Sequence, residues 1–246
     1  MKPVKDSMTI EDSDSYRCLA KKVELERRMR LLMDNHESDA AEKMFWAELC
    51  NRFPRETDIP ARVKEAWDFA SQVDYRHGNL PSWIYLNHLL RVASIIATDV
   101  PDATDETFTI AFLHNMLEVS SVSPEEIKTR FGHKVSSAIQ ALTIDRNRKD
   151  KSYLKEYYSR IEATSVACAD VKVVDKLDNI YMICFNPSPE IRSSYLDEID
   201  EWVVPMALQV VPGLGIRLKE VSMIMRRLGF LQREREVEKI VQEAGI

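Results

Sequence analysis

The sequence predicts an all-α protein, and three observations carry this prediction. Apolar residues recur at helical spacing in almost every segment of the 246-residue chain. The period-two alternation of a half-buried strand is missing, and the one strand-like run, VKVV at 171–174, has no second strand to pair with. Only six glycines occur, none in a GxGxxG or GxxxxGK[ST] pattern, so Rossmann-type and P-loop nucleotide binding are not expected.

Two amphipathic helices are expected before residue 57. The first covers 15–35, where leucine, valine and methionine side chains recur at helical intervals among charges. The second runs from about residue 37 to residue 53 and ends at Pro54. Neither helix carries candidate site chemistry, so we interpret residues 1–56 as an N-terminal extension that packs on the main domain or mediates association.

The main domain is expected to span residues 57–210, and its first half contains three apolar or amphipathic helices. They are predicted at 61–73, 84–100 and 105–120. Gly78 and Pro81 interrupt the pattern between the first and the second of these helices.

The clearest helix start in the chain is SPEEIKTRFG at 123–132. Ser123 can cap the helix, Pro124 suits its first turn, and Glu126 can complete a capping box. Gly132 is expected to end this helix in the left-handed conformation.

The second half of the chain continues the helical series. We expect helices at 133–143, 152–161, 163–185 and 188–210, with a polar, mostly basic loop at 145–151. After a turn at VPGLG, residues 211–246 are expected to form C-terminal helices that pack on the domain.

Composition limits the classes of partner. The chain has 34 basic and 40 acidic side chains and a formal net charge of −6, so neither nucleic acid nor an anionic membrane is an expected partner. The four cysteines lie far apart without CxxC spacing, so we expect reduced thiols and neither a disulfide framework nor a zinc site. The N-terminal residues lack the apolar run of a signal peptide, and no 18-residue apolar span occurs, so we expect a cytoplasmic protein.

Three places offer metal-ligating groups inside apolar helices: His88, the pair His114–Asn115, and Asp175. Helical proteins commonly hold divalent cations with imidazole nitrogens and carboxylate oxygens gathered from several helices. A single histidine is more often a satisfied core residue, and neighbouring lysines can neutralise a buried Asp175. On these residues alone, a metal site and plain core packing both remain open.

Four motifs occur in the order that is typical of one family. They are RHGNLPSWIYLNHLLRVA (76–93), AFLHNMLEVSSVSPEEIKTRFGHKV (111–135), LTIDRNRKDKSYLKEYYSRI (142–161) and VKVVDKLDNI (171–180). Together they resemble the H…HD…D signature of HD-domain metal-dependent phosphohydrolases, in the branch of the RelA/SpoT-type guanosine polyphosphate (ppGpp) pyrophosphohydrolases. The resemblance covers roughly residues 60–205. It implies an HD-type helical bundle.

The resemblance also implies a site. The expected metal ligands are His88, His114, Asn115 and Asp175. Glu118 is the expected general base for the attacking water, so Glu118 and Asn115 are the candidate catalytic residues. The family carries aspartate where this chain has Asn115, and a second acidic residue where it has Val119. Because an amide oxygen can ligate a hard cation but is neutral, we expect weakened metal binding.

Candidate substrate-binding residues are Arg76, Asn179, Lys176 and Arg146. Arg76 is the first residue of the first motif and can contact phosphate, with Lys176 as a weaker choice. Asn179 lies one turn past Asp175 and can bind ribose or base, although a plain helix-surface role is equally open. Arg146 can meet a polyphosphate, but charges in loops are more often only solvated.

The implied function is metal-dependent hydrolysis of a nucleotide, with ppGpp as candidate substrate and manganese as the cation. One alternative is a degenerate HD domain that binds a nucleotide or another phosphorylated small molecule without hydrolysing it. Another is a helical assembly protein that forms homo-oligomers through its terminal helices. Asn115 and Val119 favour the degenerate domain, whereas the retained histidines and carboxylates favour the enzyme. No ppGpp synthetase domain is expected.

Overall fold

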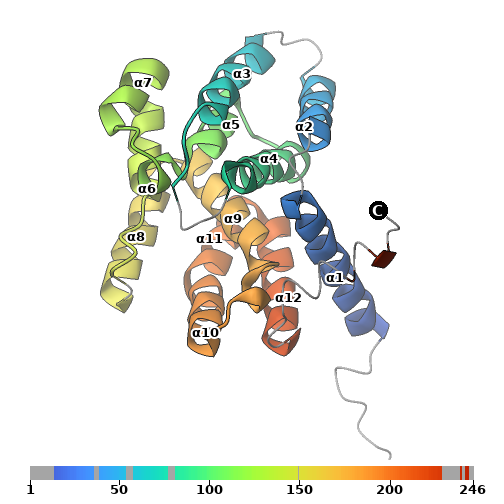
Figure 1. Cartoon of the computed structure of the whole chain (residues 1–246). Coiled ribbons are helices and arrows are strands. Elements are labelled where there is room, and N and C mark those ends of the chain that lie inside the picture. The colour runs from blue at the N-terminus through green and yellow to red at the C-terminus, as the bar shows by residue number, and fades with distance from the viewer. Residues whose placement is uncertain are drawn as a thin grey trace, which may run out of the picture.

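The computed structural model describes residues 14–35, 39–53, 58–76, 81–148, 150–228, 239 and 242–243. Every regular element of these residues is helical (Figure 1), which confirms the expected all-α class. The longer helices are α1 (Asp14–Asn35), α2 (Asp39–Arg52), α3 (Asp58–Ser71), α4 (Ser82–Asp99), α5 (Asp105–Leu113), α7 (Pro124–Leu142), α8 (Lys151–Thr164), α9 (Val166–Ile180), α10 (Pro189–Glu198) and α12 (Pro212–Leu228). The short elements are α6 (Met116–Val119), η2 (Ile183–Phe185), η3 (Ile199–Val203) and α11 (Val204–Val210).

Helix α9 lies at the centre of the molecule, and α4, α5, α7, α8, α11 and α12 all contact it (Figure 1). Its first turn is capped by Ser165, whose hydroxyl accepts a hydrogen bond from the backbone N–H of Cys168 at 3.1 Å. Every residue from Cys168 to Asp178 is buried, including five charged side chains. The apolar run VKVV lies inside this helix, so it is not a strand.

The N-terminal helices pack on α4. Arg52, at the end of α2, donates to the carbonyl oxygens of Ile96, Ala97, Val100 and Pro101 at 2.6–3.1 Å. These bonds satisfy carbonyl groups that a helix end leaves without partners.

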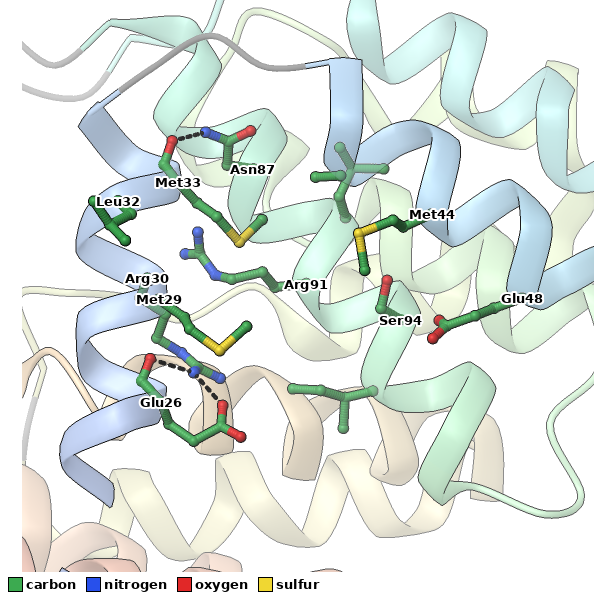
Figure 2. Close-up of a pocket in the computed structure, with 13 residues that line it drawn as sticks. Glu26, Met29, Arg30, Leu32, Met33, Met44, Glu48, Asn87, Arg91 and Ser94 are labelled. Atoms are coloured by element: carbon green, nitrogen blue, oxygen red, sulfur yellow. Dashed lines mark hydrogen bonds and ion pairs between the residues drawn. The ribbon is translucent and has the colours of Figure 1, made fainter. Parts of the chain in front are cut away.

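Helix α1 reaches α4 at one end. There the side chain of Asn87 donates to the carbonyl oxygen of Met33 at 2.7 Å (Figure 2). Between α1, α2 and α4 lies an apolar cavity of about 440 Å³, lined mainly by methionine, leucine and isoleucine side chains. The packing of α1 against α4 is therefore incomplete along its length.

The expected single helix over 105–120 is wrong, because the chain breaks into α5 and α6 at His114 and Asn115. His114 keeps helical angles but bonds its ring nitrogen Nδ1 to the carbonyl oxygen of Ala111 at 2.7 Å. Asn115 leaves the helix at φ −97° and ψ −4°. The break turns both side chains out of the regular helix.

The predicted start of α7 is confirmed: Ser123 accepts from the backbone N–H of Glu126, with Pro124 in the first turn. Gly132 interrupts this helix with φ +86° and ψ 171°, so the backbone is extended rather than left-handed helical. A helix resumes directly after it, which fits the separate helix expected at 133–143. A residue with a side chain would be strained at this positive φ.

The chain does break at VPGLG, but only at Val211 (φ −139°, ψ 81°); the expected extent of the turn is wrong, because α12 begins at Pro212 and includes both glycines. Proline suits a first helical turn, where its missing N–H costs nothing. Gly215 is needed for packing, since a Cβ atom there would lie 2.8 Å from the backbone nitrogen of Leu208.

One hydrophobic core cluster extends from Val23 in α1 to Met225 in α12. The three segments of the expected division at residues 56 and 210 thus share a core. None of the described helices combines the length and apolar character needed to cross a bilayer.

Candidate metal centre and its cavity

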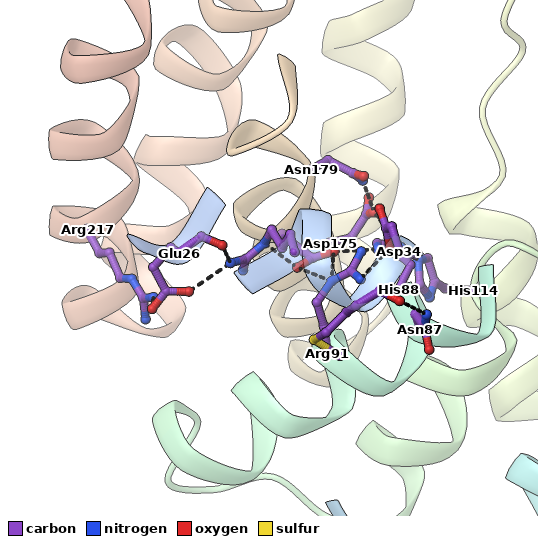
Figure 3. A network of polar contacts seen from close by, with 12 residues as sticks. Glu26, Asp34, Asn87, His88, Arg91, His114, Asp175, Asn179 and Arg217 are labelled. Atoms are coloured by element: carbon purple, nitrogen blue, oxygen red, sulfur yellow. Dashed lines mark hydrogen bonds and ion pairs between the residues drawn. The ribbon is translucent and has the colours of Figure 1, made fainter. Parts of the chain in front are cut away.

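Three helices bring three candidate ligand atoms together (Figure 3). His88 comes from α4, His114 from the end of α5 and Asp175 from α9. The Nε2 atoms of the two histidines lie 3.2 Å apart, and Asp175 Oδ1 lies 3.4 Å from His88 Nε2 and 3.6 Å from His114 Nε2. Among the described residues, these three form the group of histidine, cysteine and acidic side chains with metal-ligand spacing.

The hydrogen bonds of the two Nδ1 atoms orient both histidine rings so that Nε2 faces the other candidate ligands. His114 Nδ1 donates to the carbonyl oxygen of Ala111 at 2.7 Å, and His88 Nδ1 donates to Asp178 Oδ2 at 2.8 Å. A histidine that donates from Nδ1 presents a lone pair on Nε2, as metal-ligating histidines do. Both lone pairs therefore point at the same space beside Asp175.

The spacing of these atoms fits a small divalent cation. A cation with bonds of about 2.1 Å places neighbouring ligand atoms about 3.0 Å apart in octahedral geometry and about 3.4 Å apart in tetrahedral geometry. The observed 3.2, 3.4 and 3.6 Å lie close to this range. The mixed nitrogen and oxygen donors suit a transition-metal ion better than calcium.

Asp175 is held in its ionised form. Its burial alone would raise its pKa, but the Lys172 ammonium and both histidines lower that pKa well below the ordinary range. Lys172 Nζ contacts Asp175 Oδ2 at 3.0 Å, and Asn179 Nδ2 donates to Oδ1 at 2.7 Å. The lysine binds the outer oxygen, which leaves Oδ1 facing the histidines.

The pKa of His88 is shifted in the opposite direction, upward. Burial would lower its pKa, but hydrogen bonds and charge from Asp175 and Asp178 raise it from 6.5 to about 9. A proton shared in the short Nε2–Nε2 contact with His114 is consistent with this direction. A cation bound at this position would have to replace that proton.

The three ligands adjoin a cavity of about 410 Å³. Its polar wall is made by His88, Asn115, Glu118, Arg146, Lys172, Asp175, Lys176 and Asn179. With Asp34, Arg91 and Asp178, which also line it, the cavity has four acidic and four cationic side chains, so it can hold an anionic ligand beside a cation.

Glu118, on α6, is almost buried, and both of its oxygens have partners. Oε1 accepts from the backbone N–H of Ile144 at 3.2 Å, and Oε2 accepts from Arg146 at 2.9 and 3.1 Å. The side chain of Arg146 is 48% exposed and forms the outer side of this pair. An arriving anion can therefore reach Arg146 directly.

The other predicted substrate-binding residues are placed differently from one another. Asn179 and Lys176 line the cavity, but Lys176 is buried and bonded to Glu198 Oε1 at 2.8 Å. Arg76 does not line the cavity: its side chain is 75% exposed and pairs with Asp74 at 3.0 Å. Its backbone N–H donates to the carbonyl oxygen of Val119, which ties this loop to α6. Residues 77–80 of the same loop lie outside the described residues.

The sequence interpretation missed part of the site. Asp178, Arg91 and Asp34 also line the cavity, and Asp34 comes from α1, which was expected to carry no site chemistry. Tyr195 lines it too, and its buried hydroxyl has no hydrogen-bond partner in the described structure. The available signal was the i, i+3 spacing of Asp178 from Asp175 on one helix face.

Comparisons with known proteins agree with this arrangement. No protein-family model matches the chain. The chain is 26% identical to human MESH1 over 178 residues, which cover 70% of this chain and 95% of that protein. It is 24% identical to Drosophila melanogaster MESH1 over 150 residues, which cover 60% of this chain and 82% of that protein.

A bacterial relative and a solved structure point the same way. A protein of Aquifex aeolicus is 29% identical over 136 residues, 54% of this chain but only 19% of that protein. All three relatives are named guanosine-3′,5′-bis(diphosphate) 3′-pyrophosphohydrolases. The solved structure of a metazoan orthologue of SpoT superposes with a TM-score of 0.54 at 23% identity, over 70% of this chain and 97% of that one. The expected resemblance to this branch, and its helical fold, are confirmed.

Proposed function

We propose that this chain is an HD-type metal-dependent phosphohydrolase that removes pyrophosphate from a guanosine polyphosphate of the ppGpp class. The observation that carries the proposal is the convergence of His88 Nε2, His114 Nε2 and Asp175 Oδ1 at 3.2–3.6 Å beside a polar cavity. The names of the relatives, all ppGpp pyrophosphohydrolases, support the choice of substrate class.

His88, His114 and Asp175 would hold the cation, with Asn115 in the adjoining wall. When bound, a divalent cation supplies Lewis acidity toward a water and a phosphoryl oxygen. We propose Mn²⁺, because the family resemblance implies it and because the carboxylate and amide oxygens at the site are donors that suit it.

Glu118 is the proposed general base. It takes a proton from the attacking water while the water oxygen bonds to phosphorus and the bond from that phosphorus to the ribose oxygen breaks; the ribose oxygen leaves as a hydroxyl by taking up a proton, which Glu118 or solvent returns. Arg146 occupies Oε2 of this carboxylate. We propose that the substrate's phosphate draws Arg146 away, which frees Glu118 and stabilises the transferred group.

The remaining contacts follow from the cavity wall. Lys172 contributes positive charge near the phosphate while it stays paired with Asp175. The unpartnered hydroxyl of Tyr195 and the exposed Asn179 are proposed to bind polar groups of the ribose or base. Arg76 would contact phosphate only after a rearrangement of its loop, since it now pairs with Asp74.

One other function has specific support, namely binding of the same nucleotide without hydrolysis. Asn115 is neutral where the related motif has a negatively charged aspartate, and the charge of Glu118 is already paired with that of Arg146. Both features weaken the generation of a nucleophile at neutral pH. Both functions require binding of the same nucleotide, and only the hydrolase converts it to product.

The experiment is a pyrophosphate-release assay of the purified chain with ppGpp and with GTP as the comparison nucleotide. It is run with Mn²⁺ and with a chelator, on wild type, His88→Ala and Asp175→Ala. Asp197→Ala, which removes an exposed carboxylate on α10, is the control. We expect release from ppGpp that needs Mn²⁺, survives in the control and falls by at least about a hundredfold in the two site variants.

Turnover of ppGpp that persists in both site variants would refute the proposal. Binding of ppGpp without release under any metal condition would establish the binding function instead. The cytoplasmic location, the division at residues 56 and 210, and homo-oligomer formation stay predictions beside this proposal.

A further inference from the structure

Asp178 is a buried carboxylate that stands behind the candidate metal centre and is not itself a ligand. It lies on α9 and its side chain is 1% exposed. Its Oδ2 accepts from His88 Nδ1 at 2.8 Å, so it contacts the ring on the side away from the cation position. A buried charge of this kind is costly unless other groups neutralise it and fill its hydrogen-bonding capacity.

Two arginines from two other helices do this. Arg30 of α1 donates from Nε to Asp178 Oδ1 at 2.9 Å, and Arg91 of α4 donates from Nε to the same oxygen at 3.0 Å. Arg91 also contacts Oδ2 at 3.1 Å and donates to Asp34 Oδ1 at 2.9 Å (Figure 3). Two buried carboxylates and two buried guanidiniums thus form one group, which we call the arginine clamp (Asp34, Arg91, Asp178, Arg30). Arg30 also pairs with the partly exposed Glu26 at 2.7 Å.

The clamp determines which atoms of Asp178 face the histidine. Both arginines can only donate hydrogen bonds; both donate to Oδ1, and Arg91 also lies within 3.1 Å of Oδ2. The other oxygen is left toward His88, where it can only accept. The ring proton of His88 is therefore held on Nδ1, and the Nε2 lone pair is directed at His114 and Asp175.

Helix α1 supplies half of the clamp, Arg30 and Asp34, and an apolar cavity separates part of α1 from α4. The apolar cavity of about 440 Å³ lies between these helices, with Arg30 and Arg91 both in its wall (Figure 2). Where apolar packing is incomplete, directional polar contacts fix the position of a helix. For α1 these include the Arg30–Asp178 and Asp34–Arg91 pairs and the Asn87–Met33 bond, beside the Glu26–Arg217 pair with α12.

We propose that Asp178 is a positioning residue for His88 and that α1, through Arg30, is a functional part of the metal site. The proposal rests on the proposed function for its use of the cation, but the state of the His88 ring can be measured without one. It assigns to the N-terminal helix a role in the chemistry of the site in addition to packing.

Asp178→Asn is the sharpest test, because it preserves shape and changes one oxygen to an NH₂ group. The amide oxygen must face the two arginines, so the NH₂ group faces His88 Nδ1. The ring proton then moves to Nε2, where it blocks the cation. We expect ¹⁵N NMR of the metal-free protein to show a protonated Nδ1 on His88 in wild type and an unprotonated Nδ1 in Asp178→Asn, with His114 unchanged.

Metal affinity provides the second readout. Electron paramagnetic resonance titration with Mn²⁺ is expected to show at least a tenfold weaker site in Asp178→Asn and in Arg30→Gln, within the range for loss of such supporting groups. Arg30→Lys keeps the charge and should lose less. Arg28→Gln, on the same helix but partly exposed and paired with Glu24, is the control that should bind as wild type.

The outcomes separate the two proposals. If wild type binds no Mn²⁺, the proposed function fails, while the NMR result still decides the positioning role. If wild type binds Mn²⁺ and both variants bind it equally, with His88 unchanged on Nδ1, the positioning role is overturned. If Arg30→Gln does not fold, Arg30→Lys and Asp178→Asn carry the test.

Discussion

Asn115 lines the cavity beside His114, at the position where the related motif carries aspartate. Its side chain brings an amide oxygen to the site but no charge. Two unit charges 4 Å apart interact by about 4 kcal/mol at an effective dielectric constant of about 20, which is well above the roughly 1.4 kcal/mol that changes an equilibrium tenfold. The missing charge is therefore large enough to control the affinity for a divalent cation.

Replacing Asn115 by aspartate should strengthen the site. We expect Asn115→Asp to bind Mn²⁺ at least about tenfold more tightly than wild type by isothermal titration calorimetry. Asn51→Asp adds the same charge on the exposed surface of α2 and should leave the affinity unchanged. Equal affinity of Asn115→Asp and wild type would show that residue 115 does not face the cation.

Single residues differ in how far the sequence could identify them. His88, His114 and Asp175 could be found because few residue types ligate metals, and these lie in recognisable order. Arg30 could not be assigned, because its contact with Asp178 joins residues 148 positions apart and depends on how α1 meets α9. A charged residue on an amphipathic helix such as α1 is by default a solvated one.

At the scale of the helix, the type of element was predictable and its interruptions were not. Periodicity identified α4, α7 and α9, since their apolar residues recur over many turns. The break between α5 and α6 could not be predicted from sequence, because no glycine or proline occurs there. It depends on the bond from His114 Nδ1 to Ala111, a local choice that sequence periodicity does not contain.

Helix α9 carries another buried charge, Asp170, that makes stability depend on pH. Burial first, and the charge of Asp102 second, raise the pKa of Asp170 from 3.8 to about 6. Its Oδ1 is buried without a hydrogen-bond partner in the described structure. Because the folded-state pKa is the higher one, the contribution to stability is present below about pH 3.8 and is lost as the pH rises through about 6.

Asp170→Asn should remove this dependence. Between about pH 4.5 and about pH 7.5, we expect the free energy of unfolding of Asp170→Asn to rise by roughly 2 kcal/mol relative to wild type. Urea denaturation of both proteins at the two pH values measures it, with the exposed Asp197→Asn as control. A constant difference across this range would mean that Asp170 titrates normally in the folded chain.

At the scale of the whole molecule, the site depends on helices that are far apart in sequence. The ligands come from α4, α5 and α9, the candidate base from α6, and the supporting charges from α1. The fold class followed from periodicity alone, but the contribution of α1 required the tertiary arrangement. A hydrophobic core that joins α1 to α12 is consistent with the terminal helices acting as part of one structural unit.

The most direct test of this account is anomalous diffraction from crystals of the wild-type chain grown with Mn²⁺. We expect a single strong peak about 2.1–2.4 Å from His88 Nε2, His114 Nε2 and Asp175 Oδ1, at the edge of the 410 Å³ cavity. A chain saturated with Mn²⁺ that shows the peak elsewhere, or no peak while the two Nε2 atoms stay in contact, would contradict it.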